Sequence, residues 1–442
     1  MEEKTISVIG LGKLGAAIAA SIAHKGILVI GADVNSASVE KINDGLAPVE
    51  ETGLQELISA NRSRLRATLD VEEAVLESEL ALIFVPTPSN SEGGFSTEYV
   101  VNACQDIGRA IGRKDTYQLV VLCSTVLPGA TQNEVLPALE NASGKRCGQD
   151  FGLCYSPEFI ALGSVIDDFL NPDIMLIGES DSRAGDILED FYSRVYTSRP
   201  VVRRMNFVNA ELTKIAVNTY LTTKISFANM LADICERLPA GNVDAVTNAL
   251  GMDSRIGPKY LKGATGYGGP CFPRDNRAMV NFIRSIGLPP LLPEAVDAVN
   301  QLQVQHMAEW VQRCNPQRKR IGILGLSYKP ETPVVDESQG LLLAQALVKE
   351  GLPVTVYDPQ GMDDARDILG EAVRYAQTAE NCVRQCGVIV LTTPWPEFKR
   401  LSPDCFQKMT PPRAILDGWR ILDGEVMSQL VDYYARGKGA DI

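Results

Sequence analysis

The glycine-rich turn near the start of the chain constrains the fold more than any other feature. A short apolar stretch runs directly into Gly10, Gly12 and Gly15, and an Ala- and Ile-rich stretch follows. A second apolar stretch, at residues 28–33, ends in Asp33. This order predicts a strand, a tight turn, a helix and a second strand within about 30 residues, which is the βαβ unit of a parallel sheet.

The same turn favours a dinucleotide as its ligand. Glycines at these spacings permit a tight turn, close approach of a pyrophosphate and close packing of the helix on the sheet, and the helix N-terminus faces the phosphates. Asp33 can accept hydrogen bonds from both ribose hydroxyls and would repel a 2′-phosphate, and residues 34–36 bring no positive charge. NAD is therefore favoured over NADP. The alternative is a strand–turn–helix in which the glycines serve packing alone.

Further apolar strands alternate with helices after this unit. Strands predicted at residues 80–85 and 119–123 are followed by Thr87 and by Thr125. Alternating strands and helices predict a doubly wound, parallel sheet. Such sheets bind ligands at the carboxyl ends of their strands, where these two threonines lie.

The middle of the chain is predicted to be helical. A long helical pattern without internal glycine or proline covers residues 205–238, and a shorter one covers 242–250. A glycine-rich segment, 263–275, interrupts the pattern, and we expect helix to resume from about Asn276.

A second α/β pattern begins after a basic, proline-containing junction, with strands predicted at residues 321–326, 354–358, 388–394 and 414–417. Its first turn, 325–330, lacks the glycine spacing of the N-terminal turn, so we expect any ligand there to be bound differently. The predicted fold class is therefore α/β, with two Rossmann-like doubly wound domains joined by a central helical region. The predicted domain ranges are 1–200, 201–314 and 315–442.

Composition narrows the partners and the compartment. The chain has 42 Lys and Arg against 55 Asp and Glu, a formal charge of −13, which argues against nucleic acid as a partner. Its ten Cys form no CxxC pair and its charged N-terminus does not resemble a signal peptide, so we expect reduced thiols and a cytoplasmic location. No apolar run reaches the ~20 residues of a membrane span. Only two His are present, which argues against a His-centred metal site and against a Ser-His-Asp triad.

Cys271 is the candidate nucleophile. It lies in a Gly- and Pro-rich segment with Arg274 and Asp275 close by, although most Cys are simply small hydrophobic residues. Lys214 and Asn218 stand four residues apart on one face of the long helix, and the plain alternative is a routine exposed lysine. Beside a dinucleotide domain, a thiolate can add to an aldehyde; the adduct can then lose hydride to NAD and leave a thioester for hydrolysis.

Further motifs follow the N-terminal glycine turn along nearly the whole chain: Val85-Pro-Thr-Pro88, Ser124-Thr-Val126, Ser156-Pro-Glu-Phe159, Phe169-Leu-Asn-Pro-Asp173, Glu211-Leu-Thr-Lys214, Asp253-Ser-Arg-Ile-Gly257, Gly268-Gly-Pro-Cys-Phe-Pro-Arg-Asp275, Gly325-Leu-Ser-Tyr-Lys-Pro330 and Tyr357-Asp-Pro359. In this order they resemble the UDP-glucose/GDP-mannose dehydrogenase family. The resemblance implies an N-terminal NAD domain, a central helical region that forms a homodimer, and a C-terminal nucleotide-sugar domain. It also implies four-electron oxidation of a sugar C6 alcohol to a carboxylate, with UDP-glucose as the expected substrate.

The resemblance also implies roles for individual residues. Cys271 is similar to the nucleophile that forms the thiohemiacetal and the thioester. Lys214 resembles the lysine whose ammonium stabilises oxyanion character at C6, and Asn218 resembles its partner. Asp275 is similar to the aspartate that works with this lysine and a water in proton transfer.

Three sets of site residues follow from this resemblance. Glu158 and Thr125 resemble the pair beside the hydrolytic water, and they complete the expected catalytic set. The expected cofactor-binding residues are Gly10, Gly12, Lys13, Leu14, Gly15, Asp33, Thr87, Pro88, Ser124, Thr125 and Arg274. The expected substrate-binding residues are Glu158, Phe159, Lys214, Asn218, Arg255, Tyr260, Leu261, Gly263, Tyr267, Gly268 and Lys329.

Departures from the family pattern concern the substrate more than the chemistry. Leu162 stands where a glutamate is common, Ile174 and Asp336 stand where an arginine is usual, and Lys13 replaces a common tyrosine. The sugar therefore stays open, with a UDP-N-acetylhexosamine or GDP-mannose as alternatives to UDP-glucose. Two other classes are a two-electron NAD enzyme that modifies nucleotide sugars and a non-catalytic nucleotide-binding regulator. The intact set of Lys214, Asn218 and Cys271 argues against the first class, and the presence of Cys271 argues against the second.

Overall fold

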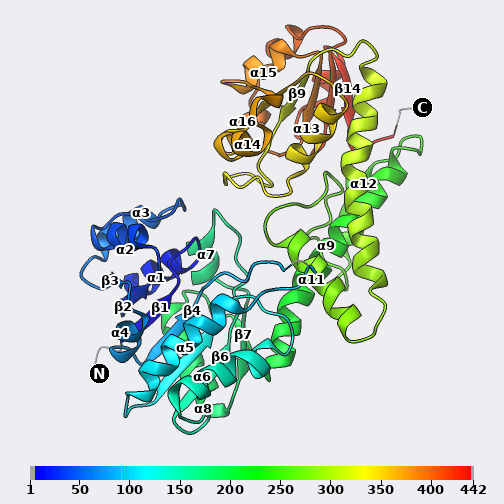
Figure 1. The fold of residues 1–442 in the computed structure, drawn as a ribbon. Helices are drawn as coiled ribbons and strands as arrows, with labels where there is room; N and C mark the ends of the chain where they lie inside the picture. The colour runs from blue at the N-terminus through cyan, green and yellow to red at the C-terminus, as the bar shows by residue number, and fades with distance from the viewer. Residues whose placement is uncertain (1–4, 91, 440–442) are drawn as a thin grey trace. The chain divides into compact units, whose positions relative to one another are not determined.

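The computed structural model describes residues 5–90 and 92–439 (Figure 1). The chain divides into two compact units, residues 1–216 and 217–442, and the division falls inside the long helix α9 (Phe207–Cys235). Residues 1–4, on which part of the signal-peptide expectation rests, lie outside the described part. Within the described ranges, every helix is too short or too polar to span a bilayer.

Unit 1 is built on one eight-stranded sheet. Its strands are β1 (Thr5–Ile9), β2 (Leu28–Ala32), β3 (Leu65–Thr68), β4 (Leu80–Ile83), β5 (Gln118–Leu122), β6 (Phe151–Tyr155), β7 (Ile174–Glu179) and β8 (Val201–Met205). They stand in the order β3-β2-β1-β4-β5-β6-β7-β8, and every neighbouring pair is parallel except β6 with β7. The four strands predicted here, β1, β2, β4 and β5, are confirmed as parallel. The reversal at β7 is not foreseen by the sequence patterns.

Helices cover both faces of this sheet. They are α1 (Gly15–His24), α2 (Ser36–Asn43), α3 (Leu54–Ala60), α4 (Val71–Leu76), α5 (Glu98–Gly112), the π-helical turn η1 (Thr131–Val135), α6 (Leu136–Ser143), α7 (Val165–Leu170) and α8 (Ser182–Val195). Side chains of α1, α2, α3, α7 and α8 form the core on one face. Those of α4, α5, α6 and the first turn of α9 form the core on the other. Because both faces are covered, the central strands are apolar at nearly every position.

The residues predicted at strand ends lie where the parallel order puts them. β1 continues into the glycine turn, Asp33 directly follows β2, and Thr87 and Thr125 follow β4 and β5. Since these four strands are parallel neighbours, all of these residues lie at the carboxyl ends of the strands, on one side of the sheet. Doubly wound sheets bind their ligands at these strand ends.

Unit 2 begins with helices. After α9 come α10 (Val243–Met252), α11 (Phe272–Ser285) and α12 (Leu291–Cys314). The expected start of α11 at about Asn276 is wrong, because the helix already begins at Phe272 and leaves Cys271 at its N-cap position. Pro273 does not interrupt it, since a proline in the first turn of a helix removes no intrahelical hydrogen bond.

The second part of unit 2 is a six-stranded parallel sheet. Its strands are β9 (Ile321–Leu324), β10 (Val354–Tyr357), β11 (Arg374–Tyr375), β12 (Val388–Leu391), β13 (Ala414–Asp417) and β14 (Asp432–Ala435), in the order β11-β10-β9-β12-β13-β14. Its helices are α13 (Gln339–Lys349), α14 (Met362–Leu369), the short 3-10 turn η2 (Gly370–Ala372), α15 (Ala379–Gln385), α16 (Pro396–Lys399), α17 (Pro403–Gln407) and α18 (Gly424–Ser428). Helices α12, α13 and α14 cover one face, and α15 to α18 cover the other.

The turn from β9 into α13 reuses two glycine positions of the N-terminal turn. Gly325 has a φ of +106°, as Gly10 has a φ of +96°. A Cβ on Gly340 would lie 2.0 Å from the Gly325 carbonyl oxygen, just as one on Gly15 would lie 1.8 Å from that of Gly10. The sequence hides this equivalence because residues 326–339 separate the two glycines. The expected difference from the first turn is therefore one of spacing, while the close helix–sheet packing is the same.

Candidate active site

The glycine turn between β1 and α1 fits a dinucleotide. A Cβ on Gly10 would lie 2.7 Å from the Phe84 carbonyl oxygen, and Gly15 packs still more tightly. A Cβ on Gly12, in contrast, would meet no heavy atom of the described residues within 4 Å, and both Gly12 and Lys13 are exposed. The backbone of the turn is therefore open to a pyrophosphate at the N-terminus of α1.

The Asp33 carboxylate lies against this turn. One oxygen accepts the N–H of Leu11 at 2.5 Å, and the other accepts the N–H of Asn35 at 2.8 Å. The side chain is half-buried. Because each carboxylate oxygen can accept a second hydrogen bond, Asp33 is held in place and can still accept from ribose hydroxyls.

The loops that follow β4 and β5 are joined by side-chain hydrogen bonds. The Thr87 hydroxyl donates to the carbonyl oxygen of Thr125 at 2.7 Å. The Ser124 hydroxyl donates to that of Val85 at 2.7 Å. Pro88 lies exposed on the first loop. Four of the predicted cofactor residues therefore stand on two loops that support each other.

Lys214 is buried, so the alternative of a routine exposed lysine is wrong. Its side chain leaves α9 with only 7% of the residue exposed, and Nζ donates to the carbonyl oxygen of Glu158 at 2.5 Å. The same ammonium lies 4.7 Å from the centroid of the Phe159 ring. A positive charge is thus fixed at the loop after β6, which carries both of these predicted site residues.

The carboxyl group of Glu158 titrates close to neutral pH. Burial raises its pKa to about 8, and the Lys214 ammonium offsets part of that rise. At pH 7 the group is mostly protonated, and above pH 8 it is mostly a carboxylate. A carboxyl that exchanges its proton in this range is suited to acid–base work on a water molecule.

Asn218, Asp275 and Cys271 lie together in unit 2. Nδ2 of Asn218 donates to Oδ2 of Asp275 at 2.6 Å. The other oxygen, Oδ1, accepts from Nε and Nη2 of Arg274 at 3.1 and 3.0 Å. Asp275 is 1% exposed, and its N–H donates to the carbonyl oxygen of Cys271, one turn earlier, at 2.8 Å. Cys271 itself is exposed.

The predicted substrate loop packs against the C-terminal sheet region within unit 2. The N–H of Gly269 donates to the Asp336 carbonyl oxygen at 2.8 Å, and Nε2 of Gln339 donates to that of Tyr267 at 3.3 Å. The Tyr267 hydroxyl donates to Oδ1 of Asp297 at 2.5 Å. Burial and this hydrogen bond raise the pKa of Tyr267. The other predicted members of the loop are also buried, namely Leu261, Gly263 and Gly268.

The remaining predicted substrate residues stand at the surface of unit 2 or near it. Nη2 of Arg255 pairs with Oδ2 of Asp253 at 2.6 Å, and the Arg255 side chain is 87% exposed. Tyr260 is also exposed, with a φ of +67°. Lys329 is half-buried in the turn that follows β9. The roles of these three residues stay predictions.

Asp358 is a buried acid that stands in a predicted motif but received no role from the sequence. It follows β10 as Asp33 follows β2, and this shared position is the signal that could have found it. Its two oxygens are saturated, because they accept from the N–H groups of Leu326, Ser327, Gln360 and Gly361, from the Ser327 hydroxyl and from Nε1 of Trp395. Asp358 therefore holds the second turn closed and offers no ribose site.

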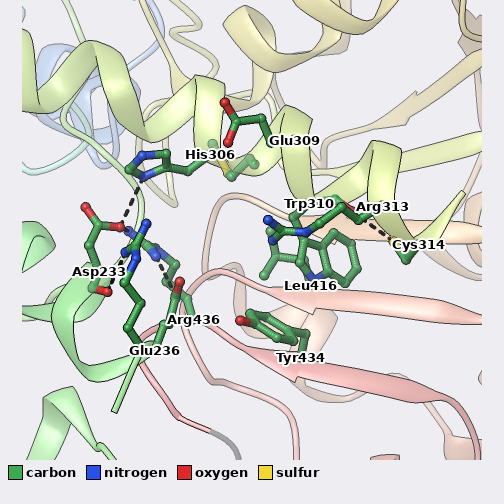
Figure 2. Close-up of a pocket in the computed structure, with 12 residues that line it drawn as sticks. Asp233, Glu236, His306, Glu309, Trp310, Arg313, Cys314, Leu416, Tyr434 and Arg436 are labelled. Atoms are coloured by element: carbon green, nitrogen blue, oxygen red, sulfur yellow. Dashed lines mark hydrogen bonds and ion pairs between the residues drawn. The ribbon is translucent and has the colours of Figure 1, made fainter.

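A cavity of about 530 Å³ in unit 2 lies between α9, α12 and the sheet edge at β14 (Figure 2). Its buried charges pair with one another: Nη2 of Arg436 lies 2.5 Å from Oδ1 of Asp233, and Arg436 also bonds Glu236. Nδ1 of His306 lies 3.1 Å from the same Asp233 oxygen. We name Arg436, Asp233 and Glu236 the Arg436 clasp. The lining includes none of the predicted catalytic residues, so this cavity is separate from the predicted site.

Three domain models of one family match the chain in order. The UDP-glucose/GDP-mannose dehydrogenase family is matched by its NAD binding domain at residues 4–196, its central domain at 208–302 and its UDP binding domain at 322–424. The resemblance expected from the motifs is therefore confirmed.

Individual relatives extend over most of the chain. The chain is 36% identical to UDP-glucose 6-dehydrogenase AglM of Haloferax volcanii over 421 residues, which cover 94% of this chain and 97% of that protein. It is 34% identical to GDP-mannose 6-dehydrogenase of Pseudomonas putida over 357 residues, 80% of each chain. Its fold matches the solved UDP-glucose dehydrogenase of Pyrobaculum islandicum with a TM-score of 0.89 and 32% identity, over 99% of this chain and 98% of that one.

Proposed function

The chain belongs to the UDP-glucose/GDP-mannose dehydrogenase family, and on this premise we propose that it oxidises the C6 alcohol of a UDP-sugar to the uronate through a thioester on Cys271. Its cofactor is NAD. The observation that carries the proposed chemistry is the hydrogen bond of Asn218 to the buried Asp275, one helical turn from Cys271. Residues four apart on a helix lie on one side of it, so Cys271 and the buried Asp275 share one side of α11, where a carboxylate can serve in proton transfer.

The N-terminal glycine turn and its neighbours are the residues that would hold NAD. We assign the pyrophosphate to the turn at Gly12, the adenosine ribose to Asp33, and the remainder to the loops that carry Thr87 and Thr125. When bound, NAD supplies the hydride acceptor. Two equivalents balance the proposed reaction, in which an alcohol, two NAD⁺ and one water give a carboxylate, two NADH and three protons.

Lys214 and Asn218 are proposed to stabilise negative charge on the C6 oxygen. The Lys214 ammonium is already buried and fixed by a backbone carbonyl, so it needs little reorganisation before it acts. The Asn218 amide is likewise oriented by Asp275. Preorganised donors of this kind stabilise charge that develops in a transition state.

Cys271 is proposed to capture the aldehyde. It stands at the N-cap of α11, the end of the helix at which the helix dipole favours a negative charge. The sulfur adds to the aldehyde carbon and gives a thiohemiacetal, and loss of hydride from that carbon gives the thioester. Asp275 is proposed to take part in the proton transfers together with a water.

Glu158 and Thr125 are proposed to act on the water that hydrolyses the thioester. As a carboxylate, Glu158 can accept a proton from that water, and the Cys271 thiolate then leaves from the acyl carbon. Burial raises the pKa of Glu158 to about 8, so this base becomes more available as the pH rises towards 8.

UDP-glucose is the substrate that we propose. Support comes from the UDP binding domain match and from the relatives named as UDP-glucose 6-dehydrogenases. The alternatives are a UDP-N-acetylhexosamine and GDP-mannose, because Leu162, Ile174 and Asp336 depart from the usual pattern and contacts in the pocket set discrimination.

A homodimer is proposed on the exposed face of α9. Tyr220, Phe227 and Ile234 are spaced by seven residues, about two helical turns, and are 62%, 46% and 45% exposed. A second copy of the chain would cover this stripe.

The three-domain division at about residues 200 and 314 stays part of the proposal. The proposed location is the cytoplasm, where the ten cysteines would stay reduced; none of them forms a disulfide in the described structure.

The test is a panel of UDP- and GDP-sugars with NAD, followed by NADH absorbance and by product mass. UDP-glucose should give the highest kcat/KM and two NADH per sugar. Turnover of GDP-sugars alone would refute the choice of substrate and leave the reaction class intact. One NADH per sugar would favour the two-electron alternative. If no nucleotide sugar of the panel gives NADH, the proposed reaction itself is refuted.

A further inference from the structure

Glu211 is a fully buried acid near the start of α9. It is 0% exposed, and its carboxylate oxygens accept the N–H groups of Gly129 at 2.6 Å and of Thr131 at 2.7 Å. Both donors belong to the segment that leads from β5 into η1. Glu211 therefore links two parts of unit 1 that lie about 80 residues apart in the sequence.

The burial of this carboxyl group calls for an explanation. Burial raises the pKa of Glu211, and the hydrogen bonds from Thr131 and Gly129 offset part of that rise. The backbone N–H groups of Gly129 and Thr131 that hold this carboxylate are neutral donors rather than cations, so the group depends on their placement. An acid in such a place is costly unless its geometry is maintained.

Glu211 stands next to the proposed machinery on two sides. Three residues further along α9, Lys214 donates to the loop after β6. The segment with Gly129 and Thr131, to which Glu211 is hydrogen-bonded, follows Thr125 in the chain. The Thr125 carbonyl oxygen in turn accepts a hydrogen bond from Thr87. The first turns of α9 are thus tied at Glu211 to the loop after β5 and at Lys214 to the loop after β6.

We propose that Glu211 is a positioning residue that fixes the Lys214 ammonium relative to the loop carrying Thr125. The carboxylate acts through the helix, since residues three apart on a helix lie on one side of it. This inference rests on the proposed function for its kinetic consequence only, because the position of Lys214 can be measured without any turnover.

The first experiment measures that position by chemical labelling. The wild-type protein and the variants Glu211→Gln and Glu211→Asp are treated with a small amine-reactive ester. The extent of acetylation at Lys214 is then quantified by mass spectrometry. In Glu211→Gln the side-chain NH₂ group faces a backbone N–H, so two donors meet. In Glu211→Asp the shorter side chain cannot reach the N–H groups of both Gly129 and Thr131. Labelling of Lys214 should rise by about tenfold in both variants, because its ammonium loses its fixed place.

Lys114 is the matched control for this labelling. It is likewise buried in unit 1, 8% exposed, and its Nζ donates to the carbonyl oxygen of Val75 at 2.9 Å. If Glu211 only supports the fold, labelling of Lys114 rises together with that of Lys214, and the proposal is overturned. Unchanged labelling of Lys214 in a folded variant overturns it as well.

The second experiment measures steady-state turnover by NADH absorbance. Displacement of a positioned group by about 1 Å costs up to ~100-fold in rate, so Glu211→Asp should lower kcat by roughly 10- to 100-fold with little change in NAD affinity. Glu134→Gln, an exposed acid on η1, should leave kcat unchanged. In a Lys214→Ala background, Glu211→Asp should slow the reaction no further, and an equal slowing there would overturn the proposal. A wild-type protein without activity would refute the proposed function and leave the labelling result to decide on Glu211.

Discussion

The Arg436 clasp permits a prediction whose size follows from burial. The Arg436, Asp233 and Glu236 side chains are 6%, 18% and 15% exposed, so all three charges lie largely out of water. Burial lowers the pKa of Arg436, but the carboxylates of Glu236 and Asp233 raise it further, so the guanidinium stays charged. Arg436→Met removes the cation and keeps most of the side-chain volume.

The expected loss comes from the two carboxylates that remain. Removing one partner of a buried ion pair costs about 3–5 kcal/mol, because the charge left behind is uncompensated. For a unit of this size, ~3–5 kcal/mol corresponds to a fall in Tm of roughly 10 °C.

Urea unfolding and calorimetry measure this loss. Arg284→Met is the matched control, because the Arg284–Glu294 pair lies in the same unit with side chains 63% and 39% exposed, and such pairs contribute less than about 1 kcal/mol. A triple variant in which Arg436→Met is combined with Asp233→Asn and Glu236→Gln should recover much of the stability. If Arg436→Met unfolds no more easily than Arg284→Met, the reasoning from burial is wrong.

Three further predictions concern the cofactor, the pH dependence and the assembly. NAD should give a kcat/KM at least about tenfold above that of NADP, because Asp33 stands where a 2′-phosphate would lie; equal values in steady-state assays would refute this assignment. Thioester hydrolysis, followed by rapid quench, should accelerate about tenfold per pH unit below pH 8 and then level off, because burial raises the pKa of Glu158 to about 8 and only the carboxylate is a base; a flat profile would exclude Glu158 as that base. Phe227→Glu should convert the proposed homodimer into monomers in light scattering, since the charge would fall on the apolar stripe, whereas Val426→Glu, at an exposed site on α18, should not.

The first glycine turn is predictable because every part of its signal is local. The spacing of Gly10, Gly12 and Gly15, the strand before them and Asp33 after the next strand all fall within one βαβ unit. The structure adds the reasons: Gly10 and Gly15 have no room for a side chain, and Gly12 faces open space among the described atoms. Local sequence and local geometry agree here, so the pattern is sufficient.

The second turn and the buried acids depend on partners far away in the sequence. Gly340 packs against Gly325 as Gly15 packs against Gly10. The residues between Gly325 and Gly340 are too many for a glycine motif to relate the two. Asp358 looks like a second ribose acid and is instead saturated by six donors, from the turn after β9, from its own turn and from Trp395. Glu211 stands in a predicted motif, yet its hydrogen bonds to Gly129 and Thr131 appear only when α9 is placed beside the loop after β5.

Local environment also decides the predicted catalytic residues. Sequence spacing alone leaves Lys214 as an exposed lysine, whereas the structure buries it against Glu158 and Phe159. The glycines and prolines around Cys271 indicate a loop, but Pro273 fits the first turn of α11 and leaves Cys271 at the N-cap. In both cases the sequence identifies the candidate residue, and only the folded structure gives its burial and its neighbours.

The most direct test of the central claim counts NADH per sugar and weighs the intact protein during turnover. Wild type with UDP-glucose and NAD should release two NADH per uronate and show an acyl adduct that maps to Cys271. Cys271→Ala should form no uronate and no adduct while it still binds both ligands, and Cys314→Ser, at a half-buried cysteine outside the predicted site, should behave as wild type. One NADH per sugar, or uronate formation by Cys271→Ala at a near-normal rate, would contradict the account.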